Sequence, residues 1–356
     1  MSSDDRAPSL EAVANRFKRV AELEFHNASP LYEGFSLHIA EDPEMLGLAA
    51  HARRGQPLPN LFFAAIHFLL LRRVEYPLAS FYPSVTAIAS HAAGETAYRS
   101  FRSFCLRHRE EIQGIISTRI VQTNEVQRCA CLLPAFALAS QKAGGRPLAL
   151  IEIGASAGLN LLWDRYGYDY GDGFRCGNAN SPVQLACTLR GDNRPAIPDS
   201  LPKISFRLGL DLNPIDVCDP EATLWLRALV WPDEVDRGVL LQRAIELAQK
   251  ASPPLMAGDA LDLLPNVFKT VPKDEILCVF HTHTVNQFPQ EAREHLSSLL
   301  AEQAKQRDLF RVSIEWGRGR RYPQLELVSF EHGLSKEKLL AHCDAHGEWL
   351  EWFYKD

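Results

Sequence analysis

The sequence predicts an α/β protein in which a doubly wound, mostly parallel sheet of about seven strands follows a helical region. Up to about residue 145, apolar side chains recur every three to four positions, which is typical of amphipathic and buried helices. From Pro147 on, short apolar runs alternate with helical segments, which is the pattern of βαβ units. We therefore expect a helical N-terminal region at 1–145 and a sheet domain at 146–356.

The helical region contains five predicted segments. Asp42 is expected to cap the second one, with Pro43 at its first position, and the last segment is expected to end at Gly144-Gly145. The segments read "SLEAVANRFKRVAELEF", "DPEMLGLAAHARR", "PNLFFAAIHFLLLRRVEY", "AYRSFRSFCLRHREEIQGII" and "TNEVQRCACLLPAFALASQKAGG".

The sheet domain contains seven predicted strands. They are "LALIEI", "KISFRLGLDL", "PLMAG", "EILCVFHTH", "FRVSIEWG", "LELVSFEH" and "EWLEWF". The predicted helices of this domain are "DPEATLWLRALVW", "RGVLLQRAIELAQK", "QEAREHLSSLLAEQAKQ" and "SKEKLLAHCDAH". Residues 172–202 are rich in Gly, Asn and Pro, so we interpret them as an insertion between the first two strands.

Composition narrows the class of protein. The net charge of −6 argues against a broad nucleic-acid surface, and no apolar run reaches the ~18 residues of a membrane-spanning helix. The acidic start lacks the character of a signal peptide, and the eight cysteines include no C-x-x-C pair. We expect a cytoplasmic protein that acts on a small molecule and has no structural zinc; the sequence does not predict its oligomeric state.

A loop of small residues follows the first predicted strand and has two interpretations. Gly154-Ala155-Ser156-Ala157-Gly158 matches G-x-S-x-G, the turn that exposes the nucleophile of α/β hydrolases. Ser156 would then need an acid, Asp211 or Asp259, and a histidine, His281 or His283. However, that turn normally follows several strands, and here the sheet begins immediately before the loop.

A cofactor loop explains more positions. The pattern Glu152-x-Gly154-x-Ser156-x-Gly158-x-Asn160 resembles the first motif of class I S-adenosylmethionine-dependent methyltransferases, although many of these have Gly where Ser156 stands. The resemblance implies that Glu152 lies near the methionine end of the cofactor and that the glycines let the main chain approach it. It also implies that Asp211, after the second strand, binds the ribose, and that Asp259 with Ala260 lies near the adenine. Asn160 would reach the cofactor from the first helical turn.

The densest polar group follows the fourth predicted strand, where α/β sheets bind ligands. If the strand continues that far, His281 and His283 face the same side, and one of them can act as general base toward an O–H or N–H acceptor. Asn286 or Gln287 would orient that acceptor. A His-x-His metal site lacks clear carboxylate or cysteine partners, and Glu315 at the next strand end either faces the cleft or caps a helix.

The segment "TNEVQR" is the second candidate. Helical spacing places Asn124 and Arg128 on one face with Glu125 near Arg128. One interpretation is a lid that projects polar groups over the cofactor or substrate; the other is a helix cap with a surface ion pair.

The whole chain also resembles the uncharacterised bacterial family called domain of unknown function 2332. The residues that carry this resemblance include "SPLYEGFSLHIAEDPEML", "FYPSV", "TNEVQR", "EIGASAGLNLLWDRYGYDYG", "LDLNPIDV", "WLRALVWPDEVDR", "GDALDLLP", "HTHTVNQF" and "HGEWLEW". The resemblance implies a Rossmann-like methyltransferase fold with a helical N-terminal region and names no reaction. A non-catalytic binding or regulatory protein on the same scaffold therefore remains an alternative.

Overall fold

A computed structural model describes residues 8–73, 75–86, 94–198, 200–317, 319–331 and 334–355. The chain forms two compact units, of which unit 1 comprises residues 1–123 and 219–242, and unit 2 comprises 124–218 and 243–356. These units differ from the predicted boundary at residue 145. Residues 124–145 belong to the unit that contains the sheet, and 219–242 belong to the helical unit although they lie between two strands in the sequence.

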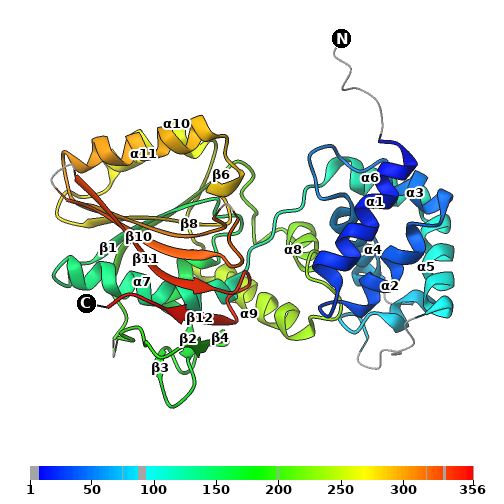
Figure 1. The fold of residues 1–356 in the computed structure, drawn as a ribbon, viewed down its shortest axis with the longest axis horizontal. Helices are drawn as coiled ribbons and strands as arrows, with labels where there is room; N and C mark the ends of the chain where they lie inside the picture. The colour runs from blue at the N-terminus through cyan, green and yellow to red at the C-terminus, as the bar shows by residue number, and fades with distance from the viewer. Residues whose placement is uncertain are drawn as a thin grey trace, which may run out of the picture. The chain divides into compact units, whose positions relative to one another are not determined.

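Unit 1 is helical (Figure 1). Its elements are α1 (Leu10–Val20), η1 (Ala21–Phe25), α2 (Pro30–Ile39), α3 (Pro43–Ala49), α4 (Leu58–Arg72), η2 (Pro77–Phe81), α5 (Glu95–Arg107), α6 (Arg109–Thr118), α8 (Pro220–Ala228) and the start of α9 (Val235–Ala251). The core of this unit surrounds α4, which is apolar on nearly every side because other helices cover it. Trp225 of α8 packs against Phe68 of α4 with ring centroids 5.7 Å apart, so 219–242 completes this core.

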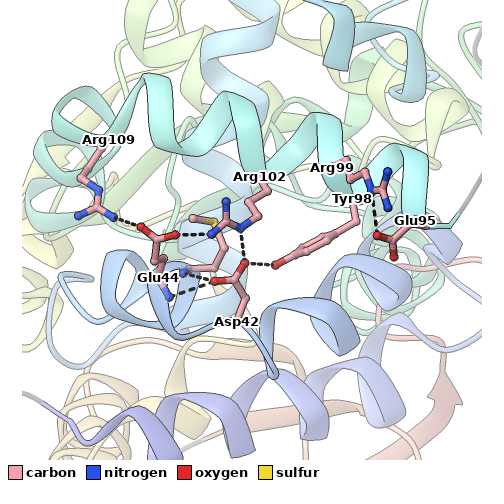
Figure 2. A network of polar contacts seen from close by, with 8 residues as sticks. Asp42, Glu44, Glu95, Tyr98, Arg99, Arg102 and Arg109 are labelled. Carbon is pink, nitrogen blue, oxygen red and sulfur yellow. Dashed lines mark hydrogen bonds and ion pairs between the residues drawn. The ribbon is translucent and has the colours of Figure 1, made fainter.

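Asp42 joins two helices of unit 1. Its Oδ1 accepts hydrogen bonds from the backbone N–H groups of Glu44 (3.0 Å) and Met45 (3.2 Å), which confirms the predicted cap. Its Oδ2 accepts from Tyr98 Oη (2.9 Å) and Arg102 Nε (2.7 Å) on α5 (Figure 2). Burial alone would raise the pKa of Asp42, but these hydrogen bonds lower it below its ordinary value.

Unit 2 contains a nine-stranded sheet in the order β5-β12-β11-β10-β9-β8-β1-β6-β7. The strands are β1 (Leu148–Ile153), β5 (Thr188–Arg190), β6 (Ile204–Asp211), β7 (Leu255–Ala257), β8 (Ile276–Thr282), β9 (Leu309–Glu315), β10 (Gln324–Glu331), β11 (Leu334–Cys343) and β12 (Trp349–Trp352). The five strands β7-β6-β1-β8-β9 are parallel, whereas β10, β11 and β12 join by antiparallel pairs. The strand order reverses between β1 and β8.

Helices cover both faces of this sheet (Figure 1). The remaining helices of unit 2 are η3 (Val126–Arg128), α7 (Cys129–Lys142), η4 (Asn160–Arg165), α10 (Ala260–Thr270), η5 (Val285–Gln287) and α11 (Gln290–Ala304). On one face, Ile153 and its neighbours pack against α10 and α11. On the other, Phe136 of α7 contacts Phe280 of β8 at 5.2 Å between ring centroids.

The structure confirms the mixed α/β class and a strand at each of the seven predicted segments, but the sheet has nine strands. The predicted helix "SKEKLLAHCDAH" is wrong, because its first nine residues lie in β11. The insertion at 172–202 supplies the ninth strand, β5, which pairs with β12. It also supplies β3 (Arg175–Gly177) and β4 (Gln184–Ala186), which form a small second sheet with β2 (Gly167–Asp169). Among the described residues, no helix is long and apolar enough to cross a membrane.

Candidate functional site at the carboxyl edge of the sheet

The small-residue loop lies where the strand order of the sheet reverses. β1 ends at Ile153, opposite Leu210 of β6 and His281 of β8, and the loop begins at the next residue. Parallel α/β sheets bind ligands beyond the carboxyl ends of the strands at such a reversal. Nearly all predicted site residues lie near the carboxyl end of one of these strands or in the segment directly after it.

Every backbone N–H from Gly154 to Leu159 has a partner within the chain. Gly154 and Ala155 donate to the Leu210 carbonyl (2.8 and 3.2 Å), and Gly158 donates to the carbonyl of Ala155 (2.7 Å). The other three N–H groups donate to side chains, Ser156 to Asp211 Oδ2 (2.8 Å), and Ala157 and Leu159 to Asn124 Oδ1 (3.2 and 3.1 Å). The loop therefore offers no free backbone donor to an anion.

Two loop residues have constrained conformations. Gly154 has φ +75°, and a Cβ at this position would lie 2.3 Å from Thr284 Oγ1, so only glycine fits against the segment after β8. Ser156 has φ +53°, which is uncommon for a residue with a side chain. Its buried hydroxyl has no hydrogen-bond partner in the described part of the chain. The loop thus holds a strained serine whose polar atom is unused.

Glu152 and Asn160 form a buried polar pair beneath the loop. Both side chains are 1% exposed, and Asn160 Nδ2 donates to Glu152 Oε1 at 3.3 Å. Asn160 Oδ1 accepts from the thiol of Cys129 at 3.3 Å, whereas Glu152 Oε2 has no partner among the described residues. Burial raises the pKa of Glu152 well above its ordinary value, and the carboxylate of Asp211 adds to the rise. Glu152 is therefore a carboxyl group that favours its neutral form.

Asp211 is the last residue of the second parallel strand, β6, and Asp259 follows the third, β7. Asp211 fastens the loop through Ser156 and accepts from the N–H of Asn213 at 2.8 Å through its other oxygen. Asp259 is exposed and caps α10, where its Oδ1 accepts from the N–H of Leu261 at 2.8 Å; Ala260 begins that helix and is buried. Each acid has a structural role here, Asp211 in holding the loop and Asp259 in capping α10.

His281 and Glu315 form a buried pair at the ends of β8 and β9. His281 Nδ1 lies 2.6 Å from Glu315 Oε1, and His281 Nε2 has no partner in the described chain. Glu315 also accepts from three consecutive backbone N–H groups, those of Thr284 and Val285 (3.0 Å each) and of Asn286 (3.2 Å). Burial alone would raise the pKa of Glu315, but the hydrogen bond and charge of His281 and these N–H groups lower it. Glu315 is thus an ionised carboxylate that accepts hydrogen bonds from the turn after β8, so of the two roles considered for it the capping role is present.

His283 lies outside the strand and differs from His281. β8 ends at Thr282, and the φ of +51° at His283 breaks the alternation that would place both histidines on one face. Register places His281 on the face of Ile153, toward α10 and α11. Burial lowers the pKa of His283 to about 4, and the charge of Arg128 contributes in the same direction. His283 is therefore neutral near pH 7, and its buried Nε2 has no partner among the described residues.

Residues 124–128 cross the same edge of unit 2. Asn124 holds the loop, and Arg128 Nε donates to the Ala345 carbonyl at 2.8 Å. Glu125 Oε2 lies 3.5 Å from His346 Nδ1. The segment is a 3-10 turn leading into α7 rather than a continuous helix, and Glu125 caps it by accepting from the N–H of Gln127 at 3.4 Å. The residue that caps the segment is therefore Glu125, and Asn124 contacts the loop instead of capping a helix; whether the segment covers a ligand stays a prediction.

The structure brings most predicted residues to one edge, in two groups. One group lies on the α7 side of the sheet and consists of Glu152, Asn160 and Arg128. The positive charge of Arg128 is close enough to lower the pKa of both Glu152 and His283. His281 and Glu315 lie on the other side, and the exposed Asn286 and Gln287 continue the turn, where Gln287 Nε2 donates to the His283 carbonyl at 2.6 Å. Sequence reasoning assigned no role to His346 or Trp316. The sequence could have indicated His346, because this residue begins the family motif "HGEWLEW". No sequence pattern indicates Trp316, whose ring centroid lies 6.2 Å from that of His283.

A metal is not indicated in the described part of the chain, where no cluster of three or more His, Cys, Asp or Glu side chains is suited to hold one.

Comparison with known proteins identified one family. The model of the family described as "uncharacterized protein conserved in bacteria (DUF2332)" matches residues 14–352, nearly the whole chain. No curated protein and no solved structure matches the chain.

Proposed function

This chain belongs to the bacterial DUF2332 family, and from the geometry of its site we propose that it is an S-adenosylmethionine-dependent methyltransferase that acts on a small acceptor. One observation carries the proposal. Of the first three parallel strands in sequence order, β1 contains Glu152 and is followed by Gly154, β6 ends at Asp211, and β7 is followed by Asp259. These positions lie at one edge of the sheet, where the parallel strands, numbered in sequence order, run 3-2-1-4-5 and the order reverses beside strand 1.

The side chains suit this cofactor chemically. S-adenosylmethionine presents an ammonium group, two ribose hydroxyls and an adenine amino group, all of which are hydrogen-bond donors. Glu152, Asp211 and Asp259 are acceptors, and the unpartnered Oε2 of Glu152 is a buried acceptor that a donor would satisfy. Glu152 would hold the ammonium group, Asp211 the ribose, and Asp259 with Ala260 the adenine, while Gly154, Ser156, Gly158 and Asn160 would line the approach.

Because every backbone N–H of the loop already has a partner, the loop does not suit a dinucleotide-binding site or the oxyanion hole of a hydrolase. A dinucleotide site uses free backbone N–H groups to hold the pyrophosphate, and the oxyanion hole of a hydrolase uses the N–H after the nucleophile. In this chain the N–H of Ala157, directly after Ser156, already donates to Asn124. A cofactor without phosphate needs neither group. We therefore expect no labelling of Ser156 by a serine-reactive fluorophosphonate.

His283 is the best-placed group to orient an acceptor. When bound, S-adenosylmethionine supplies an electrophilic methyl group, and the protein contributes positioning and exclusion of water. A neutral imidazole with an unpartnered Nε2 can accept a hydrogen bond from an O–H or N–H nucleophile, and the neighbouring Arg128 disfavours a cationic one. His281 and Glu315 hold the turn that carries His283, with Asn286 and Gln287 beside it.

Calorimetric titration of the full chain with S-adenosylmethionine tests the binding claim. Asp259→Ser keeps a good helix cap but shortens the side chain, so we expect affinity to fall about threefold to tenfold. The matched control is Asp219→Ser, because Asp219 caps α8 in unit 1 with the same geometry, accepting from the N–H of Glu221 at 2.8 Å. Absence of saturable heat with the unmodified protein would refute the proposal, and equal losses in both variants would refute the role of Asp259.

Formation of S-adenosylhomocysteine with a panel of small alcohols, phenols and amines tests catalysis. We expect turnover with at least one of these acceptors. His283→Ala should reduce the turnover rate by a larger factor than it reduces the affinity for the cofactor. If the cofactor binds but no acceptor is methylated, the alternative of a non-catalytic binding or regulatory protein gains support.

A further inference from the structure

We propose that unit 2 carries a second binding site, for a small aromatic carboxylate, in the cavity beside the C-terminal half of α7. The cavity has a volume of about 600 Å³ and lies between α7, the segment 193–198 and the residues after β12. This volume is within the range of pockets that hold small ligands. None of the residues that line it is among those of the proposed methyltransferase site.

Apolar and aromatic side chains form most of the cavity wall. Leu138 and Pro195 are buried, and the rings of Trp352 and Tyr354 stand nearly perpendicular at 6.5 Å between centroids. Tyr354 is held in place by Lys338, whose Nζ donates to its hydroxyl at 2.7 Å and lies 4.1 Å from its ring centroid. A fixed pair of perpendicular rings favours an aromatic ligand, which can meet one ring by its face and the other by its edge.

Two cations give the cavity its charge. Arg194 and Lys355 both line it, and neither pairs with a carboxylate in the described chain. Within the described ranges, the guanidinium of Arg194 donates to two neutral carbonyl groups, those of Gly191 (2.6 Å) and Asn193 (3.2 Å). On a chain of net charge −6, two uncompensated cations around an apolar cavity favour an anion with an apolar body. Two cations suit a single carboxylate better than a polyphosphate, which needs more donors.

Titration of the full chain with 2-naphthoate, and with its neutral analogue 2-naphthamide, separates the charge from the ring. We expect 2-naphthoate to bind more tightly, and the difference to shrink as salt is raised. The double variant Arg194→Ala/Lys355→Ala changes exposed side chains only, and it should weaken 2-naphthoate about threefold to tenfold while leaving 2-naphthamide unchanged.

The matched control is Lys250→Ala/Lys269→Ala, which removes the same charge from exposed helical positions outside the cavity. This control should leave both affinities unchanged. Absence of binding at millimolar concentrations, equal affinity for acid and amide, or equal weakening in the control would each overturn the proposal. Tighter binding of decanoate than of 2-naphthoate would overturn the aromatic specificity.

Discussion

Asn124 illustrates how much one side chain can determine in this protein. Its single carbonyl oxygen accepts two of the N–H groups of the loop, those of Ala157 and Leu159, and the side chain is buried. Without that oxygen, two backbone donors would be left buried and unpaired, and each such donor costs about 1–3 kcal/mol.

We therefore expect Asn124→Ala to lower the free energy of unfolding by roughly 2–4 kcal/mol, as measured by urea denaturation of the full chain. Asn266→Ala is the control, since Asn266 is exposed on α10 and its loss should change stability by less than about 0.5 kcal/mol. Similar effects of the two substitutions would show that Asn124 does not support the loop.

The close packing of Gly154 against Thr284 predicts that a side chain at position 154 destabilises the protein. Gly154→Ala places a Cβ against Thr284 and forces a side chain into positive φ, so we expect a loss of about 2–4 kcal/mol. Combining it with Thr284→Gly should recover part of the loss, because the clash disappears and the backbone strain remains. A double variant as unstable as the sum of the single variants would contradict the close contact.

The raised pKa of Glu152 predicts that the free energy of unfolding depends on pH. Its pKa in the folded chain is raised above the ordinary 4.5, so the unfolded chain releases this proton first and the group destabilises the fold as pH rises above about 4.5. Glu152→Gln cannot release a proton, so it should stabilise the chain at pH 8 and give no gain at pH 4. Chemical denaturation at the two pH values checks this; a gain independent of pH would mean that Glu152 does not titrate. The same substitution should weaken binding of S-adenosylmethionine.

At the scale of elements, the residues after β10 show where sequence patterns mislead. "SKEKLLAHC" consists mostly of good helix formers, so local propensity predicts a helix. It forms β11 instead, because its backbone pairs with β10 along most of the strand and with β12 near its end, where Leu340, Ala341 and Cys343 are buried. Tertiary pairing thus overrides a preference that is worth only tenths of a kcal/mol per residue.

The two adjacent leucines of β11 test this assignment. Leu340 is fully buried and Leu339 is 39% exposed, as alternation along a strand requires. Leu340→Ala should lower the free energy of unfolding by about 2–4 kcal/mol, and Leu339→Ala by less than about 1 kcal/mol. Comparable losses at both positions in thermal or urea denaturation would argue against a strand.

The sequence predicts those parts of the site that depend on local patterns, and it does not predict those that depend on tertiary contacts. Each of the seven strand segments was recognisable from apolar runs, and parallel strands bring the residues after them to one edge. The acids at 152, 211 and 259 were therefore predictable as neighbours of the loop. The bond from Asn124 to the loop, the pairing of His281 with Glu315 and the approach of His346 to Glu125 were not, since they join residues 33 to 221 positions apart and no periodicity records such contacts.

At the scale of the whole molecule, unit 1 is built from two separate stretches of chain. Its core includes Trp225, Ala228 and Leu229 from the second stretch, packed on α4. We expect the fragment 1–145, which ends at the boundary the sequence suggested, to unfold without a cooperative transition. Fusing residues 219–242 to the fragment 1–123 should restore a cooperative thermal transition followed by circular dichroism. Cooperative unfolding of the shorter fragment alone would show that α8 is dispensable.

Because unit 1 is built from two separate stretches, its core cannot be completed until the second stretch has been synthesised. During synthesis, residue 123 leaves the ribosome 96 residues before residue 219, and at about 5–20 residues per second that interval is roughly 5–20 seconds. Throughout it, the apolar side of α4 that α8 later covers stays exposed while β1, the loop and β6 are being made. We therefore expect the nascent chain to depend on chaperones most strongly within this interval, and to lose that dependence once Leu229 has emerged.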